Sequence, residues 1–228
     1  MDAAREVGGD FYDFFLLDGS GPHAGRLVFL IADVSGKGIP AALFMMEAKT
    51  QVRRELQNNQ SLSEAIQNVN RELSEGNDSC MFVTMWVGVL DYETGAMEYV
   101  NCGHNPPLLW QEESGWQWMR ERSGIPLGLI VARPYKTFHV ECHPGDKLLL
   151  YTDGVNEAMR EDNTQYGDER LEALANANSA KNTEELVMTL RADVADFVQD
   201  AEQSDDITIL ALEIEQTTGL PQECEADA

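Results

Sequence analysis

Four apolar segments of strand length limit what this chain can fold into. They span residues 27–34, 81–90, 147–152 and 207–215. In the last segment two sets of alternating residues are both largely apolar: Ile207, Ile209 and Ala211 on one face, and Thr208, Leu210 and Leu212 on the other. A strand of this kind is usually covered on both sides. The chain is therefore predicted to hold its strands between other layers.

The segments between these strands predict a layered arrangement. A loop at 91–95 that ends in glycine joins the strand at 81–90 to an antiparallel partner at 96–102. Helices are predicted from residue 40 to about 58, after a capping box that begins at Ser61, over 168–177, and after Asn182 or Thr183 as the cap. The long connections predict stacked antiparallel sheets with outer helices and exclude a regular βαβ alternation.

The amino-acid composition argues against several classes of binding partner. The 228 residues include 40 Asp and Glu against 16 Lys and Arg, a formal net charge of −24. Nucleic acids and anionic membranes bind through basic residues, so neither is expected as a partner. No apolar stretch approaches the roughly 18 residues that a membrane-spanning helix needs. The four cysteines lie far apart, which favours reduced thiols in a cytoplasmic protein over a zinc site or disulfide bonds.

Acidic residues recur beside the predicted strands, where a sheet would hold them rigidly. The four motifs are GGDFYD at 8–13, DVSGKG at 33–38, TDG at 152–154 and DDIT at 205–208. Several carboxylates that converge are unfavourable unless cations neutralise them. Mg²⁺ and Mn²⁺ prefer oxygen ligands of this type. The set therefore indicates a candidate site for divalent cations.

Each motif has a plainer interpretation when it is taken alone. The Asp-Gly pair at 153–154 is typical of a turn. The Asp-Asp pair at 205–206 could be a solvated charge pair or could protect the start of a strand. The Gly-Lys-Gly sequence at 36–38 lacks the spacing of a nucleotide-binding loop. Its glycines more readily allow the backbone to approach a ligand or metal.

In this order the motifs resemble those of the PPM family of metal-dependent phosphatases, the protein phosphatase 2C superfamily, in its bacterial SpoIIE/RsbU-type branch. The resemblance runs from about residue 4 to 214 and includes FVTMWVGVLD (82–91), NCGHNPPLL (101–109), GIPLGL (124–129) and LLLYTDGVNEAM (148–159). It implies an α/β (α+β) fold, a sandwich of two antiparallel β-sheets flanked by α-helices. The domain would cover residues 1–215, followed by an acidic flexible tail at 216–228.

The resemblance also implies a site for two ions of Mn²⁺ or Mg²⁺. The family's metal ligands map onto Asp10, Asp33, Asp153, Asp205 and the backbone carbonyl of Val34. Asp33 would bridge both ions, with Asp10 and Val34 on one ion and Asp153 and Asp205 on the other. These aspartates would act through a metal-activated water that attacks the phosphorus of a phosphoserine or phosphothreonine.

Four other residues are weaker candidates for the same site. Asp206 and Asp13 could bind an additional metal or support the ligands. Arg5 could contact the substrate phosphate, as a basic residue does in eukaryotic relatives, or could be a surface residue. His104 lies in a turn-rich segment and is either a loop residue or an acid or neighbour beside the metals.

The function that the resemblance implies is a serine/threonine protein phosphatase of bacterial signalling. Its substrate would be a phosphorylated STAS-type anti-sigma-factor antagonist or a similar phosphoprotein. Because Asp10 lies so close to the start, we expect the chain to be excised from a longer protein with an upstream receiver domain, as in response regulators, or a sensor domain. The charge disfavours self-association at low salt without excluding a dimer.

The alternative is a PPM-fold adaptor that is catalytically weak or inactive and binds a sigma factor or another signalling partner. The same fold can host different functions, so the fold alone does not decide. The presence of all four metal-binding aspartates favours the enzyme.

Overall fold

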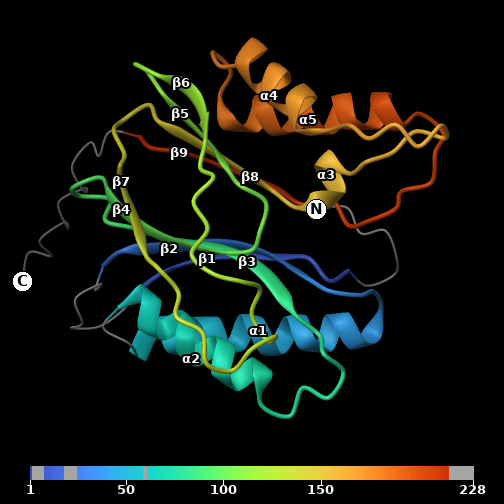
Figure 1. The fold of residues 1–228 in the computed structure, drawn as a ribbon. Helices are drawn as coiled ribbons and strands as arrows, with labels where there is room; N and C mark the ends of the chain where they lie inside the picture. The colour runs from blue at the N-terminus through green and yellow to red at the C-terminus, as the bar shows by residue number, and fades with distance from the viewer. Residues whose placement is uncertain (2–7, 18–24, 59–60, 216–228) are drawn as a thin grey trace, which may run out of the picture.

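The computed structural model describes residues 1, 8–17, 25–58 and 61–215. Arg5 and the predicted tail at 216–228 lie outside the described residues. In the described part the chain forms two antiparallel sheets that stack face to face, with helices on both outer faces (Figure 1). The predicted sandwich is therefore confirmed. Among these residues, none of the helices is long and apolar enough to cross a membrane.

The first sheet contains five strands in the order β1-β2-β3-β4-β7. Their bounds are β1 Phe11–Leu16, β2 Leu27–Val34, β3 Val83–Leu90, β4 Ala96–Cys102 and β7 Phe138–Glu141. The strand predicted at 27–34 is confirmed over its full length. The strand predicted at 81–90 begins two residues later, because Phe82 bonds with the loop residue Ser35 through both its backbone N–H and its carbonyl.

The second sheet contains four strands in the order β6-β5-β8-β9. Their bounds are β5 Leu108–Gln111, β6 Gly115–Trp118, β8 Lys147–Tyr151 and β9 Ile209–Glu213. The strands predicted at 147–152 and 207–215 are confirmed, both slightly shortened. The apolar pattern does not predict β1, β5, β6 or β7, and the last three have only four residues each.

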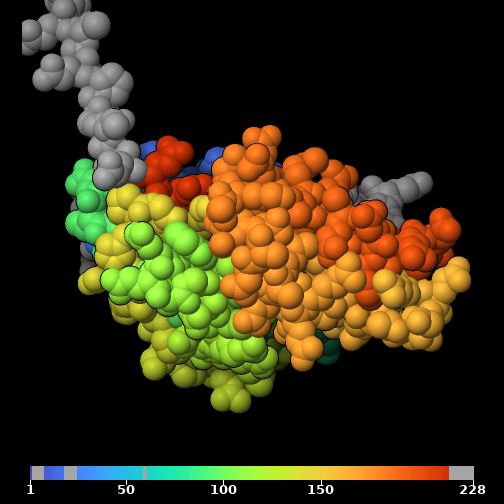
Figure 2. All heavy atoms as spheres, turned by 90° about the horizontal axis from the view of Figure 1, so that it is seen from above, coloured from blue at the N-terminus to red at the C-terminus, as the bar shows by residue number. Residues whose placement is uncertain are grey.

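Two groups of helices cover the outer faces of the sheets. Helices α1 Ile39–Asn58 and α2 Leu62–Ser74 lie on the first sheet. Helices α3 Asp153–Asn156, α4 Asp168–Ala177 and α5 Thr183–Val198 lie on the second. Figure 2 shows α4 and α5 as a continuous cover on that side, next to the β5–β6 hairpin.

Local capping explains where two of these helices begin. The Ser61 side chain accepts a hydrogen bond from the Glu64 backbone N–H at 3.2 Å, as the capping box predicts. The Asn182 side chain accepts one from the Glu185 N–H at 2.8 Å, so Asn182 and not Thr183 is the cap of α5.

The core fills the space between the sheets and the space under each helical layer. Between the sheets, Trp86 and Tyr99 stack with ring centroids 5.4 Å apart, and Phe29 packs against Trp86. The strand β9 contributes to two of these layers. Leu210 and Leu212 pack between the sheets, and the side chains of the other face pack under α4 and α5. The prediction that this strand is covered on both sides is confirmed.

Candidate functional site

The aspartates proposed as ligands come from both sheets and reach the same end of the sandwich. In the first sheet Phe11 pairs with Ala32, which sets Asp10 beside Asp33 near the end of β2. In the second sheet β8 ends at Tyr151, and Asp153 begins α3 directly afterwards. Asp205 lies in the loop that leads into β9.

Asp10 is buried and is held by hydroxyl groups from the opposite sheet. Its Oδ2 atom accepts hydrogen bonds from the Oγ1 atoms of Thr152 and Thr208, each at 2.7 Å. The Thr152 Oγ1 in turn accepts the backbone N–H of Thr208 at 3.0 Å. The two threonines therefore fix a carboxylate of the first sheet to the second sheet. Sequence reasoning did not single out either one, although each lies within an acidic motif.

Burial and mutual repulsion disfavour the charged forms of these carboxylates. Burial raises the pKa of Asp10 to about 7, although the hydrogen bonds from Thr152 and Thr208 lower it. Burial raises the pKa of Asp33 to about 8, and the charges of Asp10, Asp153 and Asp205 raise it further. The pKa of Asp153 is also raised, by burial and then by the charge of Asp205. Negative charges from four chain segments therefore interact at one place.

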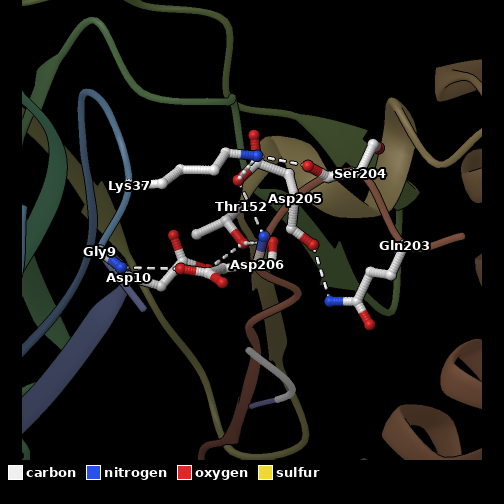
Figure 3. Close-up of polar contacts among 8 residues, drawn as sticks. All are labelled: Gly9, Asp10, Lys37, Thr152, Gln203, Ser204, Asp205 and Asp206. Atoms are coloured by element: carbon white, nitrogen blue, oxygen red, sulfur yellow. Dashed lines mark hydrogen bonds and ion pairs between the residues drawn. The ribbon is translucent and has the colours of Figure 1, made fainter. Parts of the chain in front are cut away.

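Asp206 has a role in assembling this end of the sandwich. It is buried, and its Oδ2 atom accepts the backbone N–H of Gly9 at 2.7 Å (Figure 3). This bond holds the segment before β1 against the segment before β9. One Asp206 oxygen is therefore engaged in joining these two segments.

Asp205 is the more exposed member of the pair and faces Lys37. The side chain of Asp205 is 39% exposed, and its Oδ1 atom lies 3.1 Å from the Lys37 Nζ. The same Oδ1 accepts the Asp206 backbone N–H at 2.9 Å. Lys37 also donates to the backbone carbonyl of Ser204, and Gln203 donates to the carbonyl of Asp205 (Figure 3).

Gly154 permits the close approach of α3 to the segment before β9. A Cβ atom at this position would lie 2.0 Å from the backbone oxygen of Asp206. The Asp-Gly pair at 153–154 therefore has a packing reason beyond a turn. On the other sheet a Cβ at Gly9 would lie 3.0 Å from the carbonyl oxygen of Val34, which places the proposed carbonyl ligand beside the Asp10 segment.

Asp13 and His104 have other surroundings. Asp13 lies near Arg53 and Lys49 of α1, at 3.6 and 3.9 Å, on the side of β1 that faces this helix. We therefore do not retain it among the proposed ligands. His104 is buried, its Nδ1 lies 2.9 Å from the Thr84 hydroxyl, and burial lowers its pKa to about 4. The Asn101 side chain forms hydrogen bonds with both the backbone N–H and the carbonyl of His104. These bonds favour a structural role for His104 in its loop.

The donor set fits hard divalent cations, although the side chains are not arranged as a closed cage. As placed, no three Asp, Glu, His or Cys side chains in the described part of the chain form a group that could hold an ion. Part of the reason is that Thr152, Thr208 and Lys37 engage the oxygens of Asp10 and Asp205. All the proposed donors are oxygens, which hard divalent cations prefer. Bound cations would also neutralise the electrostatic repulsion between the carboxylates. The chemistry of these donors therefore suits Mg²⁺ or Mn²⁺.

A cavity of about 470 Å³ opens beside Asp205. Its walls come from α5, from the loop before β9 and from the segment after α3. Apolar residues of these segments line much of it, including Met159, Val194 and Val198. The cavity gives a larger molecule room to approach the carboxylates from the side of the second sheet.

The hydroxyl bonds to Asp10 can be tested by replacing Thr208 with the isosteric valine. We expect Thr208→Val to lower the free energy of unfolding by about 2 kcal/mol, because a buried carboxylate loses a hydrogen bond. Urea denaturation of the metal-free protein measures the change. The control Thr50→Val removes an exposed hydroxyl that bonds to the carbonyl of Met46 in α1, and it should change stability by less than about 0.5 kcal/mol. Equal effects of the two variants would contradict this account of Asp10.

Comparison with known proteins places the chain among phosphatase-related sequences. The family model described as Stage II sporulation protein E (SpoIIE) matches residues 23–215. The chain is 28% identical over 209 residues to the phosphoserine phosphatase RsbU of Bacillus subtilis. This alignment covers 92% of the chain and 60% of RsbU, so the chain spans less than two thirds of that relative.

Solved structures share the same fold. The SiaA-PP2C domain of Pseudomonas aeruginosa matches with a TM-score of 0.79 at 18% identity, covering 93% of this chain and 83% of that one. RsbX in complex with magnesium matches with a TM-score of 0.65 at 18% identity, covering 92% and 90%. These likenesses show the fold, which is that of PP2C-type phosphatase domains.

Proposed function

Because the chain belongs to the SpoIIE family, we propose that it is a metal-dependent serine/threonine protein phosphatase of bacterial signalling. One observation carries the proposal: the carboxylates of Asp10, Asp33, Asp153 and Asp205 come from four separate segments and crowd at one edge of the sandwich, where burial and neighbouring negative charges raise the pKa of the first three. Such crowding is costly in a fold that does not use it. The relationship to the phosphoserine phosphatase RsbU supports the reaction, and the magnesium complex of RsbX supports the metal.

The residues of the proposed site fall into two groups: those that would bind the cations, and those that hold these ligands in position. Asp10, Asp33, Asp153 and Asp205, with the carbonyl of Val34, would hold two ions of Mn²⁺ or Mg²⁺. When bound, the two ions would supply an activated water and neutralise charge on the phosphoryl group. Thr152 and Thr208 hold the Asp10 carboxylate in one orientation, and Asp206 holds the backbone that carries it. The site thus joins both sheets through groups that do not themselves touch the substrate.

The proposed substrate is a phosphoprotein, for which a phosphorylated STAS-type anti-sigma-factor antagonist is the candidate. The cavity beside Asp205 supports a macromolecular substrate, since it extends the carboxylate site over the surface of α5. An upstream receiver or sensor domain, a dimer and a cytoplasmic location belong to the same proposal. So does the division into a phosphatase domain at 1–215 and a tail at 216–228.

Hydrolysis of a generic aryl phosphate tests the proposed function. We expect Mn²⁺-dependent turnover by the native chain and a loss of at least about a hundredfold in Asp153→Asn, because the variant loses a proposed ligand. A chelator should abolish the native activity, and added Mn²⁺ should restore it. No metal-dependent turnover together with tight binding of a signalling partner by both forms would instead support the adaptor alternative.

A further inference from the structure

Lys37 occupies an unusual place for a positive charge in this acidic protein. It lies in the loop between β2 and α1, between Gly36 and Gly38, which have φ angles of 87° and 78°. Residues other than glycine rarely adopt this left-handed backbone conformation. The turn lets Lys37 extend across to the loop before β9, where it meets Asp205 and Ser204 (Figure 3).

The Lys37 ammonium group lies beside Asp205, one of the proposed metal ligands. Its Nζ is 3.1 Å from the Asp205 Oδ1, and the charge of Lys37 offsets a small part of the rise that burial and Asp205 cause in the pKa of Asp153. The Lys37 side chain is 34% exposed, so it forms part of the solvent-facing entrance. The Lys37 ammonium therefore neutralises part of the negative charge of the carboxylates that we propose as ligands of divalent ions.

A divalent ion and the Lys37 ammonium compete for the same oxygen. An ion held by Asp205 and its neighbouring carboxylates would carry twice the charge of the ammonium, and Asp205 would then no longer be available to Lys37. The side chain would remain at the entrance, because its backbone is held in the loop between β2 and α1. It is then available to an anion that arrives from solvent.

We propose that Lys37 is a phosphate-binding residue that pairs with Asp205 in the metal-free protein and with the substrate's phosphoryl oxygens once a divalent ion has taken Asp205. This inference rests on the proposed function. Lysine binds phosphate as a point charge and does not require the fixed geometry of arginine. The exchange breaks no covalent bond and moves no proton.

A simple surface ion pair is the competing explanation. Exposed ion pairs contribute little to stability, and loss of this one would free Asp205 for the metal while leaving the phosphate affinity of the Mn²⁺-loaded protein unchanged. The exchange predicts effects of opposite sign instead. Loss of Lys37 should strengthen metal binding and weaken phosphate binding in the same protein.

The first measurement is Mn²⁺ binding by calorimetry in the absence of any substrate. We expect Lys37→Ala to bind Mn²⁺ at least about threefold more tightly than the native chain, because a competing cation is removed. The control Lys136→Ala removes the same charge from a lysine that packs over the ring of Phe138, 4.5 Å from its centroid. It should bind Mn²⁺ like the native chain. Unchanged or weaker binding by Lys37→Ala overturns the proposal.

The second measurement is the binding of inorganic phosphate to the Mn²⁺-loaded protein. We expect Lys37→Ala to bind phosphate about tenfold more weakly, with a raised KM for an aryl phosphate, since a charge-assisted contact is lost. Lys37→Arg should retain most of the affinity. Equal phosphate affinity in the native chain and Lys37→Ala overturns the proposal. A native chain that binds phosphate but hydrolyses no phosphate ester contradicts the proposed function and leaves the Lys37 measurement valid.

Discussion

Asp33→Asn is expected to abolish phosphate-ester hydrolysis while making the metal-free protein more stable. Activity with Mn²⁺ should fall by at least about a thousandfold, a loss of about 4 kcal/mol of transition-state stabilisation. Stability should rise because the buried Asp33 carboxyl interacts unfavourably with Asp10, Asp153 and Asp205, and an amide carries no charge. Aryl phosphate assays and urea denaturation in a chelator measure the two effects.

The direction of the pH dependence follows from the raised pKa of Asp33. Its carboxyl has a pKa of about 8 in the folded metal-free protein, against the ordinary value of 3.8 when unfolded. Between these values the folded state binds more protons, so the native chain loses stability as the pH rises from about 4 to 8. Asp33→Asn lacks this contribution and should show a flatter profile.

The control for Asp33→Asn is Asp162→Asn, at an exposed turn residue whose carboxylate accepts the Thr164 N–H. It removes one negative charge and should leave both activity and the pH profile close to native. Mn²⁺ should raise the unfolding temperature of the native chain and of Asp162→Asn, but raise that of Asp33→Asn much less. Retained turnover in Asp33→Asn would exclude it as a bridging ligand.

Gly154→Ala should give the largest loss of stability among the single substitutions considered. The added methyl would meet the Asp206 backbone oxygen at 2.0 Å and the Asp206 carbonyl carbon at 2.8 Å, so the two severe clashes are with backbone atoms that no side-chain rotation relieves. We expect a loss of about 3 kcal/mol in the free energy of unfolding, at the upper end for overpacking. Activity should also fall where the variant is still folded, because α3 carries Asp153.

The control for this substitution is Gly76→Ala. Gly76 has a φ of 73° but nothing within 4 Å of the added Cβ. The substitution therefore measures the cost of placing alanine in a left-handed backbone conformation without a steric clash. It should cost only about 1 kcal/mol and leave activity intact. Thermal unfolding followed by circular dichroism compares the variants. A Gly154→Ala protein as stable as Gly76→Ala would show that α3 can separate from the Asp206 segment without penalty.

The sequence predicted the long elements and the order of the acidic motifs because both leave local signals. The strand at 27–34 and the cap at Ser61 are confirmed, since apolar pattern and capping chemistry act over a few residues. The four-residue strands β5, β6 and β7 are too short to show such a pattern. Their position depends on pairing with distant strands.

The supporting residues of the candidate site could not be predicted in the same way. Thr208 bonds to a carboxylate 198 residues away, and nothing in its immediate neighbours indicates that partner. The same applies to Gly154, whose small size matters only because the Asp206 backbone lies against it. For Asp13 the local signal was misleading. It belongs to an acidic motif, but its position in β1 directs its side chain toward α1, where it pairs with basic residues.

The bonds between the first and last segments have a consequence for biosynthesis. Gly9 bonds to Asp206, and Asp10 bonds to Thr208, across separations of 197 and 198 residues. Contacts this remote in sequence are slow to form, and a chain emerging from the ribosome cannot make them until its final strand is available. A nascent or truncated chain that stops before β9 therefore lacks a complete carboxylate site. The carboxylate site would be complete only once β9 has been synthesised, after most of the sandwich has folded.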